Sequence, residues 1–548
     1  MKNRLLIAIF SMLIFWGNNN ISAQVTDVYK QQRQQWLKKA AEAKPPLIKQ
    51  IKKPISLVKA VKDSSAYQGW KTVKAGDINQ FYRSSFKQNN VMIVDFGEHF
   101  TGTFSCTFDT LGNISDAPVR FKLTFAEMPA ELGEPFDPYH GGLSRAWLQD
   151  EIVTLPYAPY TVTIPRRLAF RYVKIELLAA SSYFDVCVSD INMEATSCVQ
   201  ESKLSLAPDT DPLIKEINRV GLSTLKECMQ TVYEDGPKRD MRLWIGDLYL
   251  EALANAYSYQ NNALTKRCLY LLAGLAKPSG ILSSNISEVP TPRAQNSVTL
   301  DYCLLYNVVL HEYLKTSGDK ETAEDLWPVA VNQLLLAQEY LNNEGLYDTA
   351  KQPQYWLVFD WKDNFDRHAS IQGLMTFAFN ETYQLAKLLG KESEVKELPR
   401  LINKMKKASR KYLYDQKHGV FVSGQDKHIS YLSQAWMALS ETLSPKECAK
   451  ALQTAIQNPE ACYPGSPYGY HYVIEALIKC GLGETARDMM IYYWGGMVKK
   501  GADTFWEVYD PNDDCRSPYN SHLINSYCHA WSCTPVYFIN KYPDIFQK

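Results

Sequence analysis

The feature that most constrains the fold of this 548-residue chain is a long series of apolar residues at helical spacing, which begins near residue 206 and continues to the C-terminus. Such spacing is typical of helices with one buried face. Ser444, Pro445 and Glu447 mark one helix start clearly, because they form a capping box with proline at the first helical position. The predicted helices are residues 212–232, 247–260, 263–276, 297–317, 321–342, 369–389, 394–414, 430–440, 445–457, 468–480, 483–500 and 521–540. About twelve successive helices predict hairpins closed into an α/α toroid, with its site where interhelix loops meet at one end of the axis.

The region before the helices, residues 66–200, has the pattern of short strands. Residues 119–125 alternate strictly between apolar and polar side chains, and residues 160–164 alternate as well. Short strands between Gly, Pro and Asp turns predict a β-sandwich. We expect this sandwich to be an accessory scaffold packed against the helical domain, with sugar binding by the sandwich itself as the alternative. Residues 24–65 are weakly patterned and predict an extended or partly helical lead-in.

The N-terminal residues 1–23 have the pattern of a secretory signal peptide. Lys2 and Arg4 precede an apolar run that is too short to span a bilayer, and Ala23 supplies a small residue at the cut. No cysteine follows this run, and no second long apolar segment is present. The sequence therefore predicts an exported protein, periplasmic or extracellular, without a membrane anchor. The net charge of +0 gives no reason to expect binding to nucleic acid.

Motifs for cofactors and metals are missing from the sequence. It contains no Gly-rich phosphate loop, dinucleotide fingerprint, HExxH or Asp-rich calcium loop, and its 12 cysteines form no CxxC pair. We therefore expect neither a cofactor nor a metal. The cysteines are expected to be buried free thiols, although Cys187 could pair with Cys198, and Cys515 with Cys528 or Cys533. The oligomeric state stays open.

One charged loop between two predicted helices is the strongest candidate for a site. Gly236 and Pro237 break the preceding helix, because proline disfavours helical geometry in the residue before it. The loop combines three carboxylates and two guanidiniums with a tryptophan. These residues are Asp235, Arg239, Asp240, Arg242, Trp244 and Asp247. Acceptors for hydroxyl groups beside an apolar platform suit sugar binding, whereas a solvated loop of ion pairs is the alternative; the pattern leaves both open.

Three later segments also combine polar and aromatic side chains. Glu507 is flanked by aromatic residues, a setting that raises the pKa of a carboxyl group and suits acid/base chemistry, although pairing at a helix end fits equally well. Asp360 and Trp361 fall in a loop, where a turn with Trp361 in the core is favoured over ligand contact. His529 falls in the last predicted helix near Ser532, but no GxSxG elbow accompanies them, and we reject a serine hydrolase.

Five motifs follow one another along the chain. They are Asp-x-Pro-x-Arg-acid-x-x-x-Trp-x-Gly-Asp at 235–247, Phe-Asp-Trp at 359–361, Tyr-Trp-Gly-Gly-Met at 493–497, Thr-x-Trp-Glu at 504–507 and Cys-His-Ala-Trp-Ser at 528–532. This series resembles the bacterial α-L-rhamnosidases of glycoside hydrolase family 78, in the six-hairpin clan. The resemblance covers residues 206–548, and the preceding sandwich is similar, less specifically, to the family's accessory β domain.

The resemblance implies a β-sandwich followed by an (α/α)6 barrel, and inverting hydrolysis of a terminal α-L-rhamnosyl residue from a glycan or glycoside. Inversion needs two carboxyl groups roughly 6.5–9.5 Å apart, with a water molecule beside the base. Asp240 matches the family's general acid and Glu507 its general base. The implied sugar-binding positions are Asp235, Arg239, Trp244, Asp247, Asp360, Trp361, Trp506 and His529.

The chain departs from the family's pattern at two positions. The usual acid is Glu, and Asp240 is one methylene shorter, which places the proton donor about 1.5 Å further back. The usual Cys of the first motif is Gly236. Three alternatives follow: Asp247 or Asp235 as the acid, another deoxy or uronic sugar as the substrate, and a glycan-binding protein without catalysis.

Overall fold

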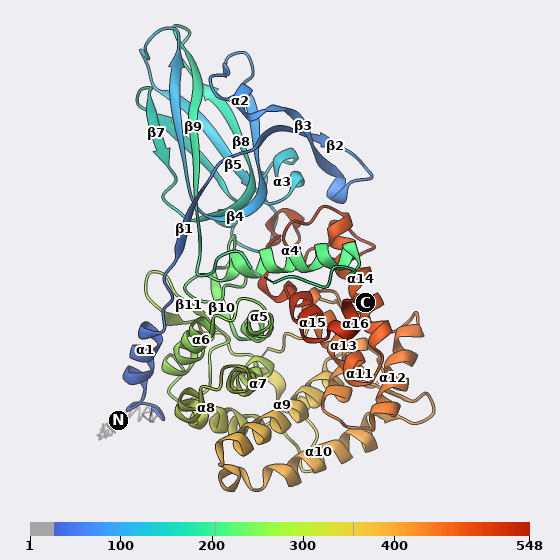
Figure 1. Cartoon of the computed structure of the whole chain (residues 1–548). Helices are drawn as coiled ribbons and strands as arrows, with labels where there is room; N and C mark the ends of the chain where they lie inside the picture. The colour runs from blue at the N-terminus through green and yellow to red at the C-terminus, as the bar shows by residue number, and fades with distance from the viewer. Residues whose placement is uncertain (1–26, 203, 355) are drawn as a thin grey trace, which may run out of the picture.

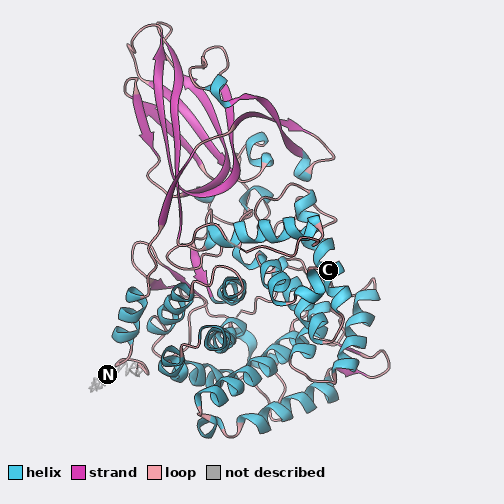
Figure 2. Ribbon diagram, viewed as in Figure 1, coloured by secondary structure: helices cyan, strands magenta, loops and turns pink. Residues whose placement is uncertain are grey.

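The computed structural model describes residues 27–548 apart from residues 203 and 355, so that the predicted signal peptide, residues 1–23, lies outside the described part. A β domain is followed by a domain of helices, which lies beneath it in Figure 1. Figure 2 shows most strands in the upper part of the molecule and most helices in the lower part, with a few short helices beside the sheet and short strands among the helices. The predicted order of strands and then helices is confirmed.

The β domain is a nine-stranded antiparallel sheet. Its longest strand, β4 (Val91–Leu111), pairs with β8 (Leu168–Ala179) over its first half and with β9 (Asp185–Ser197) over its second. Gly102 lies where the pairing changes, and a Cβ atom there would lie 2.0 Å from the Glu194 carbonyl oxygen. Only glycine allows so close an approach of two strands. The other strands are β1 (Ile48–Lys52), β2 (Ser56–Lys62), β3 (Trp70–Asp77), β5 (Val119–Ala126), β6 (Asp150–Leu155) and β7 (Tyr160–Thr163).

Phenylalanine rings fill the core of the β domain. Phe104 and Phe108 of β4 face Phe125 and Phe121 of β5, with ring centroids 5.0 and 4.3 Å apart. All four side chains are fully buried. The strict alternation of residues 119–125 therefore marks the buried face of a strand, as predicted.

The weakly patterned lead-in is built into both domains. Helix α1 (Arg33–Glu42) packs against helix α6 (Asn262–Gly274) of the barrel, where Arg267 Nη1 donates a hydrogen bond to the Ala40 carbonyl at 2.6 Å and Trp36 is buried. Strands β1 and β2 then join the sheet by pairing with β9 and β4. The lead-in therefore contributes a helix to the barrel surface and two strands to the β domain.

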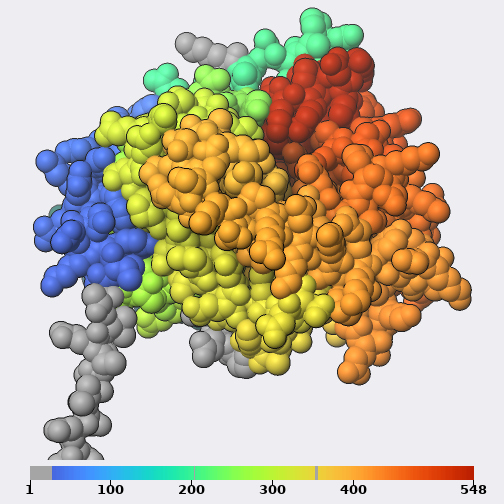
Figure 3. All heavy atoms as spheres, turned by 90° about the horizontal axis from the view of Figure 1, so that it is seen from below, coloured from blue at the N-terminus to red at the C-terminus, as the bar shows by residue number. Residues whose placement is uncertain are grey.

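The helical domain is a ring of hairpins, an (α/α)6 barrel. The inner helices from α5 to α13 pack side by side in chain order, and α15 packs against α5. His471 of α13 stacks on Phe538 of α15, with ring centroids 5.1 Å apart, which closes the ring. The inner helices are α5 (Ile245–Ala256), α7 (Leu300–Ser317), α9 (His368–Leu389), α11 (Tyr431–Leu439), α13 (Pro467–Lys479) and α15 (Pro535–Lys541). The outer helices are α4 (Pro212–Cys228), α6 (Asn262–Gly274), α8 (Lys320–Gln338), α10 (Leu398–Tyr412), α12 (Pro445–Gln457) and α14 (Gly483–Lys499), and α16 (Pro543–Phe546) follows α15. Figure 3 shows the face away from the β domain, where segments from the middle of the chain predominate and the blue N-terminal segment lies at one edge.

The prediction of a last helix over residues 521–540 is mostly wrong. Only residues 535–541 are α-helical, and the stretch before them contains two short 3₁₀ turns, η5 (His522–Ile524) and η6 (Ala530–Ser532). Its backbone groups bond to other segments instead: His529 N donates to the Phe505 carbonyl at 2.9 Å, and Ala530 N donates to the Asp235 carbonyl at 2.8 Å. Because these two backbone groups have partners in other segments, no α-helix is needed to satisfy them.

The suggested disulfides are also wrong. All twelve cysteines are free thiols, and most of them are buried, which was the favoured expectation. Cys228 and Cys528 come close, with sulfur atoms 3.9 Å apart, at the contact between α4 and the 528–532 motif. Here the thiols act as small apolar side chains.

Candidate active site

A cavity of about 180 Å³ opens where the first turns of the inner helices meet the long loops of the barrel. It collects side chains from four parts of the helical domain and one residue of the β domain, Leu143. Pockets for drug-sized ligands are typically about 300–1,000 Å³, so this cavity suits a single sugar ring. Its lining consists of Leu143, Asp235, Arg239, Asp240, Trp244, Asp247, Tyr302, Trp356, Val358, Trp361, Glu507, Tyr519, His529 and Trp531.

Most of the residues singled out from the sequence meet in this cavity, although they come from segments up to almost 300 positions apart. They are Asp235, Arg239, Asp240, Trp244, Asp247, Trp361, Glu507 and His529. Asp360 and Trp506 do not line it. The Asp360 carboxylate is buried and accepts hydrogen bonds from Gly465 N at 2.6 Å and from the Ser466 hydroxyl, so that it braces the loop before α13. Trp506 is buried too and stacks on Tyr67 of the β domain, with ring centroids 4.2 Å apart.

Several cavity residues were not found from the sequence. Trp531 lies inside the Cys-His-Ala-Trp-Ser motif, so that the motif itself was a usable signal. Tyr302 is in the first turn of α7, and nothing in its local sequence distinguishes it from a core residue. Trp356 and Tyr519 lie in loops whose course depends on the rest of the fold, and nothing in their local sequence indicated a role.

The 235–242 loop is shaped by the carboxylate of Asp235. Its two oxygens accept hydrogen bonds from Arg242 N at 3.0 Å and Asp240 N at 3.2 Å. A Cβ atom at Gly236 would lie 2.5 Å from Ser526 Oγ and 2.6 Å from the Arg239 carbonyl, which explains glycine at this position. The loop then enters the short strand β10 (Arg242–Trp244) and helix α5. These contacts direct the Asp240 side chain into the cavity.

Glu507 is held on both oxygens. Its Oε2 pairs with the Arg239 guanidinium and accepts a hydrogen bond from Ser526 N at 3.3 Å, and its Oε1 accepts one from the Tyr519 hydroxyl at 2.5 Å. Burial by itself would raise the pKa of this carboxyl, but Arg239, His529 and the Tyr519 hydroxyl outweigh it and hold the pKa below its usual value. Glu507 is therefore an ionised carboxylate at neutral pH.

The aspartates of the loop have different surroundings. Burial, followed by the charge of Asp240, raises the pKa of Asp235 to about 8. Burial also raises the pKa of Asp247, whose Oδ1 lies 3.3 Å from His529 Nε2. Burial would lower the pKa of His529, but the Asp247 and Glu507 carboxylates raise it instead. Each of these two groups therefore stabilises the charged form of the other, while burial opposes the charge on both.

Asp240 is the most accessible of the three aspartates. About 16% of its side chain is exposed, and Oδ2 lies 3.1 Å from Arg242 Nη1. The Asp247 side chain, by contrast, is only 2% exposed. Asp240 and Glu507 therefore approach one small cavity from two separate segments of the chain.

Larger hollows elsewhere lack this convergence of carboxylates. One of about 660 Å³, near His368 and Tyr412, has Asp366 as its acid. Another of about 1,010 Å³ lies along α10, and its lining includes three lysines and an arginine together with Glu344 and Glu397. Neither joins two carboxylates to a set of aromatic rings, and the chemistry of a sugar site is concentrated in the smaller cavity.

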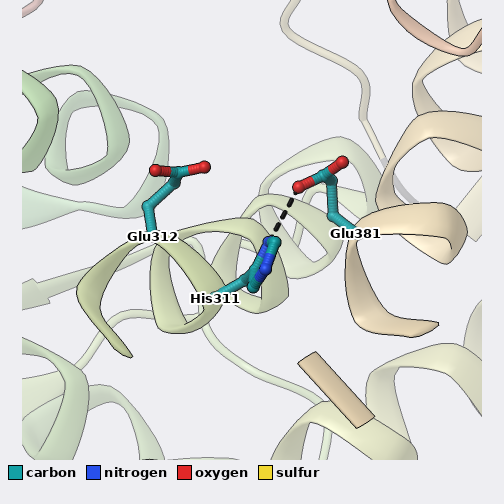
Figure 4. A group of neighbouring side chains, drawn as sticks. All are labelled: His311, Glu312 and Glu381. Atoms are coloured by element: carbon teal, nitrogen blue, oxygen red, sulfur yellow. Dashed lines mark hydrogen bonds and ion pairs between the residues drawn. The ribbon is translucent and has the colours of Figure 1, made fainter. Parts of the chain in front are cut away.

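One group among the described residues has the composition of a metal site, and it lies away from the cavity. His311, Glu312 and Glu381 offer ligand atoms within 4.8 Å of one another (Figure 4). His311 is nine residues beyond Tyr302 on α7, about 14 Å along the helix. His311 Nδ1 and Glu381 Oε2 are already paired at 2.8 Å, and Lys315 Nζ lies 2.6 Å from the Glu312 carboxylate. Both carboxylates therefore have partners in the protein.

No helix of the described residues combines the length and apolar character that a bilayer span requires.

The barrel, the small cavity and its carboxylates define the chain as a glycoside hydrolase of the six-hairpin type. Residues 208–542 match the bacterial alpha-L-rhamnosidase 6 hairpin glycosidase domain, and residues 54–195 match the glycosyl hydrolase family 78 alpha-rhamnosidase N-terminal domain. The protein belongs to glycoside hydrolase family 78, the α-L-rhamnosidase family, as the resemblance of its motifs implied.

Solved structures agree with this assignment. A rhamnosidase from Klebsiella oxytoca with rhamnose bound is 36% identical, with a TM-score of 0.90, and the match covers 93% of this chain and 99% of that one. A family 78 rhamnosidase of Bacillus sp. GL1 shares the fold at 20% identity and a TM-score of 0.67, over 82% of this chain and 46% of that one. The α-L-rhamnosidase of Streptomyces avermitilis complexed with L-rhamnose does so at 14% and 0.65, over 91% and 44%. A search of curated proteins found no match.

Proposed function

We propose that the protein removes terminal α-L-rhamnosyl residues from glycans or glycosides by inverting hydrolysis. The observation that carries the proposal is the placement of Asp240 and Glu507 on different segments that line one cavity of about 180 Å³. A cavity of this size accepts one sugar ring, which supports attack at the end of a chain. The similarity to the Klebsiella oxytoca rhamnosidase with bound rhamnose supports L-rhamnose as that sugar.

Asp240 is the proposed general acid. Its side chain is partly exposed to the cavity, so that it can reach the oxygen of a glycosidic bond at the mouth. The alternatives are less well placed, because both oxygens of Asp235 accept backbone hydrogen bonds of their own loop and Asp247 lies against His529. In this mechanism Asp240 gives its proton to the leaving oxygen as the glycosidic bond breaks.

Glu507 is the proposed general base. Its lowered pKa keeps it ionised, and Oε1, which accepts one hydrogen bond from the Tyr519 hydroxyl, can accept a further hydrogen bond from a water molecule. The carboxylate takes a proton from that water as the water oxygen attacks the anomeric carbon from the opposite side of the ring. Arg239 and Tyr519 fix the plane of the carboxylate, which orients the water before the reaction.

In the proposed complex, aromatic side chains bind the apolar face of the sugar and polar side chains bind its hydroxyl groups. Trp361 lies beside Trp531 and Tyr519, with ring centroids 6.4 and 5.8 Å away, and these rings form an apolar wall. Such a wall suits the ring face and the methyl group of a 6-deoxy sugar. Asp247 and His529, on the polar side, are proposed to bind its hydroxyl groups.

The proposal includes export. Residues 1–23 have the pattern of a secretory signal, which supports activity in the periplasm or outside the cell on glycans that reach the cell surface. Processing is tested by N-terminal sequencing of the protein purified from a secreting host. A mature N-terminus at or near Gln24 supports export, and retention of Met1 in the cell contradicts it.

A panel of nitrophenyl glycosides tests the sugar. Release of nitrophenol from the α-L-rhamnoside at a kcat/KM well above that for other deoxy sugars and uronides is the expected result. A clear preference for another sugar would change the proposed substrate, but the protein would still be a glycoside hydrolase. Binding of oligosaccharides without any product after prolonged incubation would contradict the proposed catalysis.

A further inference from the structure

A lysine beside the proposed catalytic residues is completely buried in the contact between the two domains. Lys238 lies between Asp235 and Asp240 in the same loop, and its side chain is 0% exposed. Its ammonium group lies 2.9 Å from Glu127 Oε2 and 3.1 Å from Glu131 Oε1. Both glutamates belong to the β domain: Glu127 directly follows strand β5, and Glu131 lies on the short helix α3 (Pro129–Gly133).

The same carboxylate oxygen of Glu127 also binds the other side of the site. Tyr527 N donates a hydrogen bond to Glu127 Oε2 at 2.9 Å. Its neighbour Ser526 holds Glu507 twice: the Ser526 carbonyl accepts from Glu507 N at 2.9 Å, and Ser526 N donates to Glu507 Oε2 at 3.3 Å. One oxygen of the β domain therefore joins the loop that carries Asp240 to the segment that holds Glu507.

Glu127 is well supported as a charged anchor. Its other oxygen, Oε1, lies 3.1 Å from His99 Nε2, and the side chain is 1% exposed. Burial alone would raise its pKa, but Lys238 and His99 outweigh burial and lower the pKa to about 2. A buried ion pair often adds little net stability compared with apolar packing, so a further role would account for its presence.

We propose that Glu127 is a positioning residue, which fixes the separation of Asp240 and Glu507 by binding Lys238 and the Tyr527 backbone together. The inference rests on the proposed function, because it assigns the acid and the base to those two residues. It makes the β domain a working part of the active site. Inverting hydrolysis depends on this separation, since a water molecule must fit between the base and the sugar.

The contacts of Glu127 predict that their loss changes kcat more than KM. Trp244 and Asp247, which line the cavity and are implied sugar-binding positions, are held independently of Glu127. Strand β10 pairs with β11 (Asn285–Ser287), and Ile245 N donates to the Ser284 carbonyl at 3.1 Å. Loosening the Glu127 contacts should therefore misplace the acid and the base while the sugar pocket stays in place, so that kcat falls more than KM rises.

Two substitutions at Glu127 separate positioning from charge. Glu127→Ala removes both contacts, and a misplacement of about 1 Å is expected to lower kcat about 100-fold, with KM within about threefold of wild type. Glu127→Gln keeps a carbonyl oxygen that can accept from Lys238 and Tyr527, and it should recover most of kcat. Thr196→Val is the matched control: it removes the 3.1 Å hydrogen bond from Thr196 in β9 to Gln230, an interdomain contact away from both catalytic segments.

A crystal structure of Glu127→Ala supplies a readout that does not depend on turnover. The expected result is a changed distance between the Asp240 and Glu507 carboxyl groups, together with the loss of kcat. If Glu127→Ala does not fold, the triple variant Glu127→Gln, Glu131→Gln and Lys238→Met removes the charge of Lys238 and of both its carboxylate partners, and it should be stable but still slow. An unchanged carboxyl separation with wild-type kcat in a folded variant would overturn the proposal.

Failure of the wild type to hydrolyse any rhamnoside would instead count against the proposed function, and the carboxyl separation would still decide the role of Glu127.

Discussion

The Tyr519 hydroxyl donates a hydrogen bond of 2.5 Å to Glu507 Oε1, while Arg239 pairs with the other oxygen of the same carboxylate. Tyr519 comes from the loop after the Thr-x-Trp-Glu motif, and Arg239 comes from the loop that carries Asp240. The proposed base is therefore oriented by the segment of the proposed acid and by a loop of its own. Their contacts lower the pKa of Glu507 despite its burial.

Removal of either proposed catalytic carboxylate should nearly abolish turnover. Asp240→Asn and Glu507→Gln keep the shape of the side chains but remove the acid and the base, and each should lower kcat by about 10²–10⁴-fold. Rates are measured with a nitrophenyl rhamnoside and folding by circular dichroism. Asp363→Asn, at an exposed residue near Trp361, serves as the control. Full activity in both catalytic variants would show that the acid and base are misassigned.

Substitution of Tyr519 by Phe should change the pH dependence of the reaction. The Tyr519 hydrogen bond helps to lower the pKa of Glu507, so its loss raises that pKa, and the base becomes protonated at a higher pH. The acidic limb of the kcat/KM profile should therefore move to higher pH. Tyr492→Phe, at an exposed tyrosine on α14, should leave the profile unchanged. A Tyr519→Phe profile that overlays the wild type would refute this role for the hydroxyl.

Trp361 should contribute to binding more than to chemistry. Trp361→Ala removes part of the apolar wall next to Trp531 and Tyr519, and a loss of ~1.4 kcal/mol corresponds to a roughly tenfold rise in KM. Trp361→Phe keeps a ring and should lie near the wild type. The measurement is the KM of the wild type and of both variants for one rhamnoside. An unchanged KM in Trp361→Ala would exclude Trp361 as a sugar platform.

Glu127 should also contribute to stability in a way that depends on pH. Its pKa is lowered from 4.5 to about 2 in the folded protein, so its charge stabilises the fold above pH 4.5, and this stabilisation is lost as the pH falls to about 2. The difference in Tm between wild type and Glu127→Gln should therefore shrink across that interval. A difference in Tm that stays constant from pH 6 to about pH 2 would mean that the contacts with Lys238 and His99 do not lower the pKa of Glu127.

The sequence predicted most of the helices because their apolar periodicity is local. It also predicted the 235–247 loop, where a broken helix coincides with dense charge and a tryptophan. Residues 521–534 were beyond such reasoning, because their backbone bonds to Phe505, Glu507 and Asp235, partners set by the tertiary fold. The packing of Trp506 on Tyr67 was hidden for the same reason, since Tyr67 belongs to the other domain. The motif alone does not show whether a residue such as Trp506 lines the cavity or packs against the other domain.

The role of Lys238 shows the same limit at the site itself. In the sequence Lys238 is one charge in a loop rich in aspartate and arginine, and a lysine in such a loop is ordinarily exposed to solvent. Its burial follows from Glu127 and Glu131, which lie more than a hundred positions earlier in a strand-rich region. The predicted scaffold domain therefore supplies charged partners to the loop that carries Asp240, which periodicity could not reveal.

An NMR time course with a synthetic α-L-rhamnoside tests the central claim most directly, because the first anomer released reports both the sugar and the mechanism. Two carboxylates with a water molecule between the base and the sugar predict that β-L-rhamnose forms first and the α anomer appears only by mutarotation. Initial release of α-L-rhamnose would contradict the inverting mechanism and the roles of Asp240 and Glu507. The absence of any released rhamnose would contradict the proposed substrate.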